Sequence, residues 1–436
     1  MPPADPTLPP APPVATPDDR PRVLMLTHRL PVPPNRGDRI RSFHLLGELR
    51  QRFHVSLACT TDHDPTPDDR VALGELVHRC RAHTLSPRDS KVAGLVALLK
   101  GRPATPACFY REALAEAIVQ WHRERPFDAV LTFCSGMIGY ARAVFDATPS
   151  GARRPVHVLD LVDVDSAKWD AYAKAMTGGV LNPMRWVYAA EAKRLVPIEA
   201  GGAVAFDHVT VVSGREAETY RRRLGLSDKL HVVHNGVDLE AYHPPRHEPE
   251  PANRVVFVGQ MDYLPNVEAV AWFAREVMPL LTARAPEAVF RIVGRSPTAA
   301  VRRLAERGRV EVTGAVDAIL PELHGAAVVV APLRIARGVQ NKVLEAMAAG
   351  RAVVASPQAA EGIDALAGSE LLVADAPSQW ADRIATLLRD PTRREHIGHA
   401  ARARMDKDRP WSAALAPMLD LLDRRTAGAH PLPRVA

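Results

Sequence analysis

The stretch from Gly338 to Glu345 holds the residues of this sequence whose types and spacing best suit the binding of an anion. Gly338 lies just before the start of a predicted helix, where backbone N–H groups and the positive end of the helix dipole favour a phosphate group. Lys342 sits in the first turns of that helix and can reach the same anion. Glu345 follows on the same face, where its carboxylate can accept hydrogen bonds from a ribose diol. These positions predict a nucleoside diphosphate site, and the alternative is a weak surface ion pair between Lys342 and Glu345.

Carboxylates and a histidine also follow predicted strands in the first half of the chain. Asp160, Asp163 and Asp165 come at the end of an apolar run, and the carboxyl ends of parallel strands face the ligand cleft in α/β proteins. A carboxylate there is placed to orient a substrate hydroxyl, although the same spacing also fits a metal site. His28 follows the first predicted strand, where it can act as a base or serve a structural role. Asp38 begins the next helix, and capping that helix is the alternative to a chemical role.

The elements that must position these residues are strands alternating with helices. Arg22–Thr27 is a short apolar run bounded by prolines, which is typical of a buried parallel strand. Apolar residues then recur with helical spacing from Ile40 to Leu49, and His54–Cys59 predicts the next strand. Further strands are predicted at 128–133, 156–161, 208–213, 231–234, 254–259, 289–293, 310–313, 327–331 and 352–355, and a helix at 266–283. Such alternation predicts the α/β class, with parallel sheets covered by helices on both faces.

The alternation restarts at Arg254 much as it began at Arg22, and a chain of 436 residues is too long for one core. We therefore expect two Rossmann-like, doubly wound domains that face a cleft. We expect a disordered proline-rich tail at 1–21, a first domain at 22–242, a polar linker at 243–252 and a second domain at 253–410. A C-terminal helix and tail follow at 411–436, and they can return to the first domain.

The composition is that of a soluble globular protein, with 47% hydrophobic and 24% charged residues. The net charge of +6 is modest; it does not indicate nucleic-acid binding, but it suits a nucleotide diphosphate or an anionic membrane. The 4 cysteines lack the spacing of a zinc site or a disulfide framework. No secretory signal precedes Arg22 and no apolar stretch reaches the roughly 20 residues of a membrane span, so a cytoplasmic protein is expected. Aromatic and basic residues around Trp186 suggest peripheral contact with the inner membrane face, or a helix that buries its aromatics.

The residues after Glu345 extend the first pattern into a known motif. From Gly338 to Val354 the sequence resembles Gly-x-x-x-Lys-x-x-Glu-Ala-Met-Ala-x-Gly-x-Pro-Val-Val of the retaining, group 4 glycosyltransferases of the GT-B fold, with Ala352 in place of the proline. The segments 234–238 and 257–259 are also similar to that family. The resemblance implies transfer of a sugar from a nucleotide-diphosphate donor, with retention of configuration and with no metal or other cofactor.

The resemblance also implies roles for single residues on the donor side. It assigns Glu345 to the donor ribose, Lys342 to the diphosphate, and Gly338 to close backbone approach. Gly259 opens the nucleotide-binding domain, and Gly37 occupies the place of a glycine loop under the diphosphate. Arg337 replaces a glutamate found in many members, and its guanidinium can stabilise the leaving group or remain an exposed loop side chain.

In the first domain the resemblance implies an acceptor side. Asp38, Asp160 and Asp165 are expected to contact the acceptor, and Asp163 and His28 to take part in catalysis. The segments 34–46, 160–169 and 259–267 resemble, more narrowly, the sugar transferases associated with exosortase systems in exopolysaccharide loci. This implies a glycan or lipid-linked acceptor in exopolysaccharide or cell-envelope synthesis.

Three other functions fit parts of the pattern. A sugar-nucleotide epimerase of the same fold would also bind a nucleotide diphosphate, but it would not need the motifs at 34–46 and 160–169. A nicotinamide-dependent oxidoreductase is disfavoured because no Gly-x-Gly-x-x-Gly follows either opening strand. A non-catalytic two-domain sugar-binding protein would be expected to carry an export signal.

Overall fold

The structure, a computed structural model, describes residues 20–176, 182–225, 228–245, 253–335 and 338–423. The chain divides into two compact units, Met1–Val233 with Leu415–Ala436, and His234–Ala414. The division falls before the segment 243–252 that the sequence predicts as a linker, of which 243–245 is described. Of the predicted tail, residues 1–19 lie outside the described residues.

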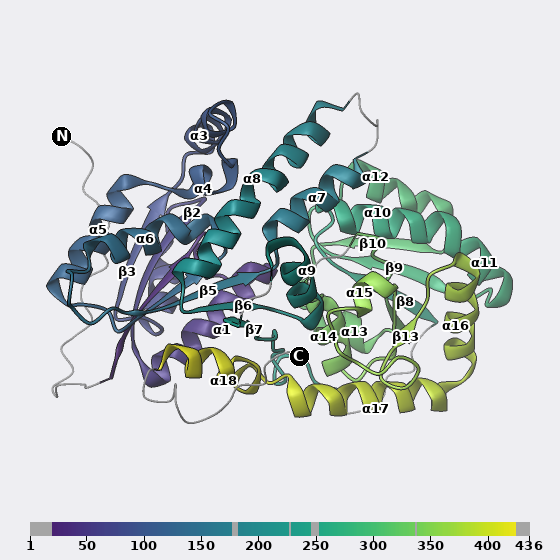
Figure 1. Cartoon of the computed structure of the whole chain (residues 1–436). Coiled ribbons are helices and arrows are strands. Elements are labelled where there is room, and N and C mark those ends of the chain that lie inside the picture. Colours follow the sequence, from purple (N-terminus) through teal and green to yellow (C-terminus); the bar gives the residue numbers. More distant parts are fainter. Residues whose placement is uncertain (1–19, 177–181, 226–227, 246–252, 336–337, 424–436) are drawn as a thin grey trace. The chain divides into compact units, whose positions relative to one another are not determined.

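In the described part of the first unit, 7 parallel strands form one sheet in the order β3-β2-β1-β4-β5-β6-β7 (Figure 1). The strands are β1 (Arg22–Thr27), β2 (His54–Thr61), β3 (Arg79–Thr84), β4 (Ala129–Phe133), β5 (Val156–Val162), β6 (His208–Val211) and β7 (Leu230–Val232). The helices are α1 (Gly37–Arg52), α2 (Pro67–Gly74), α3 (Pro87–Leu99), α4 (Ala104–Phe109), α5 (Glu112–Glu124), η1 (Ser135–Met137), α6 (Ile138–Ala147), α7 (Asp165–Ala175), α8 (Pro183–Ala205), α9 (Gly214–Leu224) and α18 (Trp411–Leu422), whose last residues from Leu415 belong to this unit.

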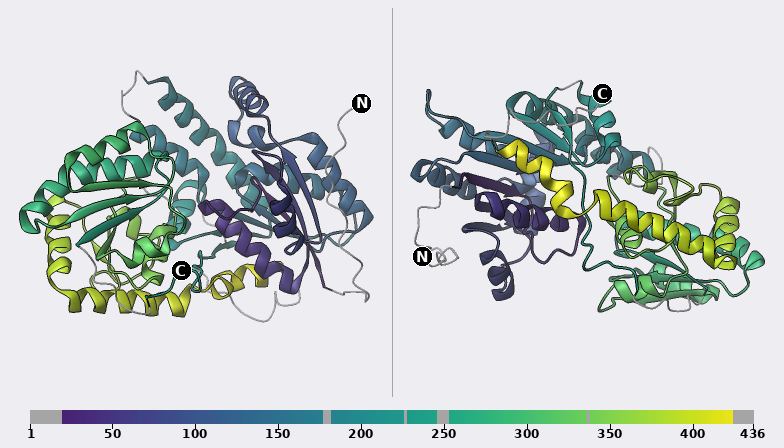
Figure 2. Two further views of the ribbon diagram at one scale, coloured as in Figure 1. Left: turned by 180° about the vertical axis from the view of Figure 1, so that it is seen from behind. Right: turned by 90° about the horizontal axis from the view of Figure 1, so that it is seen from below.

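The central strands of this sheet are buried on both faces because their residues are apolar. Val23–Leu26 of β1 are fully buried, and every residue of neighbouring β4 is buried. Such strands need helices above and below the sheet, which Figure 2 shows. The parallel order also brings the carboxyl ends of β1, β4 and β5 to one edge, where His28, Cys134 and Asp163 follow.

The described part of the second unit contains 6 parallel strands in the order β10-β9-β8-β11-β12-β13 (Figure 1). The strands are β8 (Arg254–Val258), β9 (Val289–Val293), β10 (Val310–Gly314), β11 (Val328–Ala331), β12 (Val353–Ala355) and β13 (Leu372–Val373). The helices are α10 (Leu264–Trp272), η3 (Phe273–Val277), α11 (Met278–Arg284), α12 (Ala299–Arg302), η4 (Arg303–Arg307), α13 (Leu320–His324), α14 (Asn341–Ala348), α15 (Pro357–Ala360), α16 (Pro377–Arg389) and α17 (Pro391–Asp408). Two doubly wound parallel sheets confirm the predicted fold class.

The helix predicted at 266–283 is continuous in space but changes its winding. Between α10 and α11, Phe273–Val277 form a π-helical turn. Pro279, in the first turn of α11, has no N–H to donate, and its ring crowds the carbonyl four residues earlier. A local widening of the helix relieves that crowding.

The two ends of the second unit lie against each other. The backbone N–H of Val237 donates to the carbonyl oxygen of Arg409 at 2.8 Å, and Val237 forms a parallel bridge with Pro410. A side chain at Gly236 would overlap Trp411, so a glycine is required for this approach. The first and last segments of the second unit are therefore in direct contact.

Candidate functional site

In the second unit, three predicted donor residues meet at the carboxyl end of β8. Lys342, in the first turn of α14, donates to Oδ1 of Asn266 at 2.6 Å, and its ammonium lies 4.4 Å from the centre of the Phe257 ring. A Cβ at Gly259 would lie 3.0 Å from Nζ of Lys342 and 2.8 Å from Nδ2 of Asn266. Gly259 thus leaves room for the lysine, and Glu345 follows one turn later on the same helix.

Burial controls the charges of Lys342 and Glu345. It lowers the pKa of Lys342 to about 7, although Glu345 opposes this shift. It also raises the pKa of Glu345 to about 7, although Lys342 opposes that shift. Both side chains are partly buried, and these shifts favour the donor-site interpretation over an exposed i,i+3 ion pair. Two partly buried groups whose pKa values are shifted toward neutrality are typical of a functional site.

The backbone that leads into α14 is shaped by glycines. Gly338 has φ of +62°, a left-handed conformation that other residues adopt only with strain. Its carbonyl oxygen would lie 3.0 Å from a Cβ at Gly362, so the two segments approach closely. Arg337, predicted to stabilise the leaving group, lies outside the described residues.

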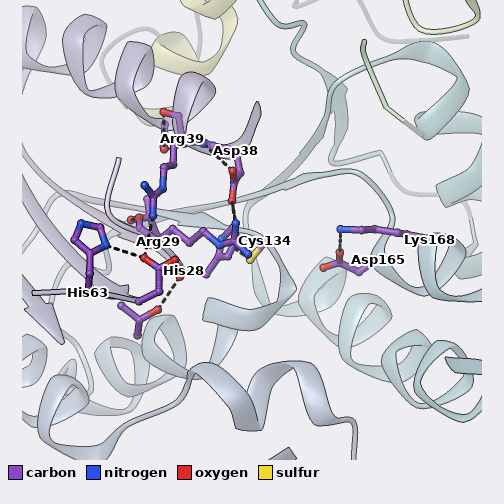
Figure 3. A network of polar contacts seen from close by, with 12 residues as sticks. His28, Arg29, Asp38, Arg39, His63, Cys134, Asp165 and Lys168 are labelled. Atoms are coloured by element: carbon purple, nitrogen blue, oxygen red, sulfur yellow. Dashed lines mark hydrogen bonds and ion pairs between the residues drawn. The ribbon is translucent and has the colours of Figure 1, made fainter. Parts of the chain in front are cut away.

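In the first unit, His28 and Asp38 form an ion pair that the sequence did not predict as a pair (Figure 3). Nε2 of His28 lies 3.2 Å from Oδ2 of Asp38, and Nδ1 lies 3.3 Å from Sγ of Cys134. Arg29 Nη1 lies 3.3 Å from the same Asp38 oxygen. The His28 ring stacks against Phe133, with ring centres 5.9 Å apart.

The surroundings favour the charged forms of this pair. Burial lowers the pKa of His28, but electrostatic and hydrogen-bond interactions with Cys134 and Asp38 raise it more, to about 10. Burial raises the pKa of Asp38, but His28 and Arg29 together hold it well below its usual range. A histidine that keeps its proton at neutral pH supplies positive charge and is a poor base.

Asp163 and Asp165 lie near one lysine at the start of α7. Nζ of Lys168 lies 4.0 Å from Oδ1 of Asp165 (Figure 3). Ser135 donates its hydroxyl proton to Oδ2 of the same carboxylate. Burial lowers the pKa of Lys168, but Asp165 and Asp163 raise it more, so the net pKa lies above its usual value. The ammonium is therefore held in place by carboxylates from one loop and one helix start.

Asp160 does not project from the end of its strand, as the sequence predicts, but is fully buried. Its carboxylate accepts hydrogen bonds from Nε of Arg41 at 2.8 Å, from Nη2 of Arg41 at 3.3 Å, and from the Thr210 hydroxyl at 2.8 Å. Arg41 is buried as well, so this ion pair joins α1 to the sheet. The position fits a structural role and leaves Asp160 out of reach of an acceptor.

Gly37 is the first residue of α1, and the residue before it, Arg36, makes no side-chain cap hydrogen bond. The capping alternative for Asp38 is met only in part, because its Oδ1 accepts from the adjacent N–H of Arg39 while Oδ2 contacts His28. Asp38 thus belongs to the polar cluster at the end of β1.

Sequence patterns did not reveal several residues of these clusters. Cys134 and Asn266 each lie 76 or more positions from the residue they contact, so no local spacing marks them. In the sequence, Lys168 stands out only as one of the basic residues near Trp186. The signal that could have found Cys134 is its position directly after a buried strand of a parallel sheet.

Within the described ranges, no group of three or more His, Cys, Asp and Glu side chains is placed to hold a metal ion. The prediction that the reaction needs none is not tested by this. Nor does any described helix combine the length and apolar character needed to cross a membrane.

Two family models match consecutive parts of the chain. Residues 40–241 match the model described as Glycosyltransferase Family 4, and residues 252–390 match the model described as Glycosyl transferases group 1. No curated protein matches the sequence.

Solved structures with the same fold include three that each match nearly the full length of both chains. Sucrose-phosphate synthase from Thermosynechococcus elongatus is 18% identical, with a TM-score of 0.68, covering 94% of this chain and 100% of that one. HepE from Anabaena, solved in complex with UDP-glucose, is 14% identical, with a TM-score of 0.62 and coverage of 92% and 99%. WaaG, a glycosyltransferase involved in lipopolysaccharide biosynthesis, is 15% identical, with a TM-score of 0.61 and coverage of 92% and 100%. With two parallel α/β units and both family matches in this order, the chain is a glycosyltransferase with a family 4 first domain and a group 1 second domain.

Proposed function

We propose that the chain transfers a sugar from a nucleotide-diphosphate donor to a glycan or lipid-linked acceptor in exopolysaccharide or cell-envelope synthesis, with retention of configuration. The observation that carries the donor assignment is the cluster of Gly259, Lys342 and Glu345, all partly buried, around the buried Asn266. HepE, which shares the fold, was solved with UDP and with UDP-glucose, which supports a nucleotide-sugar donor.

The donor cluster fits the electrostatic demands of the reaction. A nucleoside diphosphate leaves with growing negative charge, so fixed positive charge near its phosphates lowers the barrier. Lys342 supplies that charge from a partly buried position in the first turn of α14, and the first N–H groups of α14 favour the same anion. Glu345 accepts hydrogen bonds from the ribose. Arg337 and Gly37 are proposed as additional contacts to the diphosphate.

The first-unit cluster is proposed as the acceptor side. Because His28 is held in its charged form, we assign it to electrostatic stabilisation of developing negative charge rather than to proton abstraction. Asp163 and Asp165 are proposed to orient the acceptor hydroxyl, with Lys168 fixing their positions. No metal ion is needed in this scheme, because the cations Lys342 and His28 come from the chain.

We also propose a cytoplasmic location, where thiols stay reduced. All 4 cysteines are free in the structure, and neither Cys59 nor Cys80, both buried, is in a disulfide.

A thermal-shift screen against UDP, GDP and ADP tests the donor assignment. A ligand at one hundred times its dissociation constant stabilises the fold by about 2.7 kcal/mol. We expect one nucleotide to raise the melting temperature of the wild type, and Glu345→Ala to lose most of that rise. Glu395→Ala, an exposed position on α17, is the matched control and should respond as the wild type does. Absence of a shift with all three nucleotides and their sugars would refute the donor site.

Retention is tested separately, on the product. Once the donor is known, proton NMR of the freshly formed glycoside gives the anomeric configuration. The same configuration as in the donor supports the proposal, and inversion contradicts it without affecting the donor assignment.

A further inference from the structure

Helix α3 of the first unit carries its large apolar side chains on the outside. Val92, Leu95, Val96 and Leu99 are exposed by 60%, 58%, 41% and 79% of their surface. Their spacing places all of them on one face of a helix with 3.6 residues per turn. Isolated exposed apolar residues are ordinary, but four on one face form a patch that water solvates poorly.

The inward face of α3 carries mostly small residues instead. Gly94 and Ala97 are the buried residues of this helix. A Cβ at Gly94 would lie 2.9 Å from Sγ of Cys108 and 3.5 Å from Cβ of Ala104, so α3 lies closely on α4. The helix stands beyond α4 at the margin of the first unit (Figure 1). Leu98 is partly buried as well, so the inward face of α3 consists of Gly94, Ala97 and Leu98, and the four exposed aliphatic residues lie opposite it.

Basic residues flank the apolar face. Arg88, Lys91, Lys100 and Arg102 are all exposed, and Asp89 is the one acidic residue between 86 and 103. Arg88 lies on the same face as Val92 and Leu99, and Lys91 and Lys100 lie at its two sides. An apolar stripe bordered by cations fits the boundary between lipid headgroups and acyl chains.

A groove of about 1090 Å³ continues this surface beyond the C-terminal end of α3. Gly101, Arg102 and Pro103 line one end, and residues of α6 and α8 line the rest. The floor is largely apolar, with Phe145 and Ile198. The charged residues along the groove are Arg102, Arg142, Lys193, Arg194 and Asp146. The excess of positive charge thus extends from the helix to the groove.

We propose that the first unit docks on anionic lipid bilayers through the apolar face of α3, with the basic residues of α3 and the groove contacting the lipid phosphates. This goes beyond the proposed transfer reaction and does not rest on the donor site. It also places the contact on α3 rather than at Trp186 on α8. Partial insertion of four aliphatic side chains and attraction to anionic headgroups act together, so each contributes to binding.

Vesicle flotation with the full chain tests the proposal. The probes are vesicles of phosphatidylcholine alone and of phosphatidylcholine mixed with phosphatidylglycerol. We expect binding only to the mixed vesicles, and a fall of at least about tenfold in the partition coefficient for Leu95→Ser/Leu99→Ser and for Lys91→Glu/Lys100→Glu. Val71→Ser, a change of an equally exposed aliphatic residue on α2 of the same unit, is the control and should bind as the wild type does.

The other outcomes overturn the proposal. If the wild type floats with neither vesicle, membrane docking is refuted. Loss of flotation in Trp186→Ser with full flotation in the α3 variants would place the contact on α8 instead. Concentration-dependent dimers that disappear in Leu95→Ser/Leu99→Ser would identify a second copy of the chain as the partner. Circular dichroism and the melting temperature of each variant show that the fold is intact, and nucleotide binding is measured on the same samples.

Discussion

Nζ of Lys342 lies 2.6 Å from Oδ1 of Asn266, a residue 76 positions earlier in the chain. Asn266 is buried, and its Nδ2 donates to the carbonyl oxygen of Gln260 at 2.9 Å, which fixes the direction of its side-chain oxygen. The asparagine therefore holds the lysine beside Gly259 before any ligand is bound. A preorganised cation binds an anion without first losing side-chain freedom.

Replacement of Asn266 should weaken donor binding through Lys342. We expect Asn266→Ala to lower the affinity for the nucleoside diphosphate roughly tenfold, because the lysine loses its orienting hydrogen bond. Isothermal titration calorimetry measures this. Asn253→Ala, in the same unit just before β8, is the control. An unchanged affinity in Asn266→Ala would show that the ligand orients Lys342 by itself.

The contribution of Lys342 should depend on pH. Since burial lowers its pKa to about 7, the side chain is charged below that pH and neutral above it. We expect the loss of affinity caused by Lys342→Met to be up to about tenfold larger at pH 6 than at pH 8. Comparing the two proteins at each pH cancels the titration of the ligand itself. Equal losses at both pH values would mean that the bound lysine stays charged throughout.

The left-handed backbone at Gly338 can be tested with a matched glycine. Gly338 and Gly308 have φ of +62° and +65°, and no atom lies within 4 Å of a Cβ at Gly308. We expect each change to alanine to destabilise the fold by about 1 kcal/mol in urea denaturation, because both force a strained conformation. Only Gly338→Ala should also weaken nucleotide binding. A similar loss of nucleotide binding in Gly308→Ala would point to a general effect on the second unit.

Asp160 should matter for stability, since it is buried against Arg41. Asp160→Asn leaves the guanidinium without its charge partner, and we expect a loss of roughly 3–5 kcal/mol in the free energy of unfolding. Asp146→Asn removes an exposed partner of Arg142 and should cost about 0–1 kcal/mol. If Asp160→Asn folds as stably as the wild type but has lost activity, the original assignment to the acceptor side is correct.

Glu199 should destabilise the first unit at alkaline pH. It is fully buried, and burial raises its pKa from 4.5 to about 7, while one oxygen accepts from the N–H of Ser166 at 3.0 Å. A carboxyl whose pKa is raised on folding favours the folded state less and less as pH rises from about 4.5 to 7. Glu199→Gln keeps the acceptor oxygen, so we expect it to stabilise the fold by roughly 1–3 kcal/mol above pH 7 and by little at pH 5. A variant less stable than the wild type at pH 8 would contradict this.

The buried strands could be predicted from the sequence because their signal is local. Runs such as Arg22–Thr27 and Arg254–Val258 are apolar throughout, and the structure has strands at both. In contrast, the sequence pattern does not predict β3, because Arg79, Arg81 and His83 interrupt any apolar run there. β3 lies at the edge of the sheet, where only part of each strand is buried and polar residues are tolerated.

The site was predictable only where its residues are close in sequence. Gly338 lies just before α14, and Lys342 and Glu345 lie within it. Their relative positions therefore follow from the spacing in the sequence. The partner of Asp160 is Arg41, 119 positions away, and the resulting burial could not be read from the run of aspartates. The pKa values near 7 in the donor cluster likewise depend on burial by residues from other elements.

The contact between Val237 and Arg409 has a consequence for synthesis on the ribosome. The second unit is one uninterrupted stretch whose ends are joined, so all of its residues are available once the chain has reached Ala414. The first unit instead needs Leu415 and the residues after it, which are made last. Although its sheet is translated first, the first unit is thus the later of the two to have all its parts, and loss of the chain from Leu415 onward would damage the first unit rather than the second.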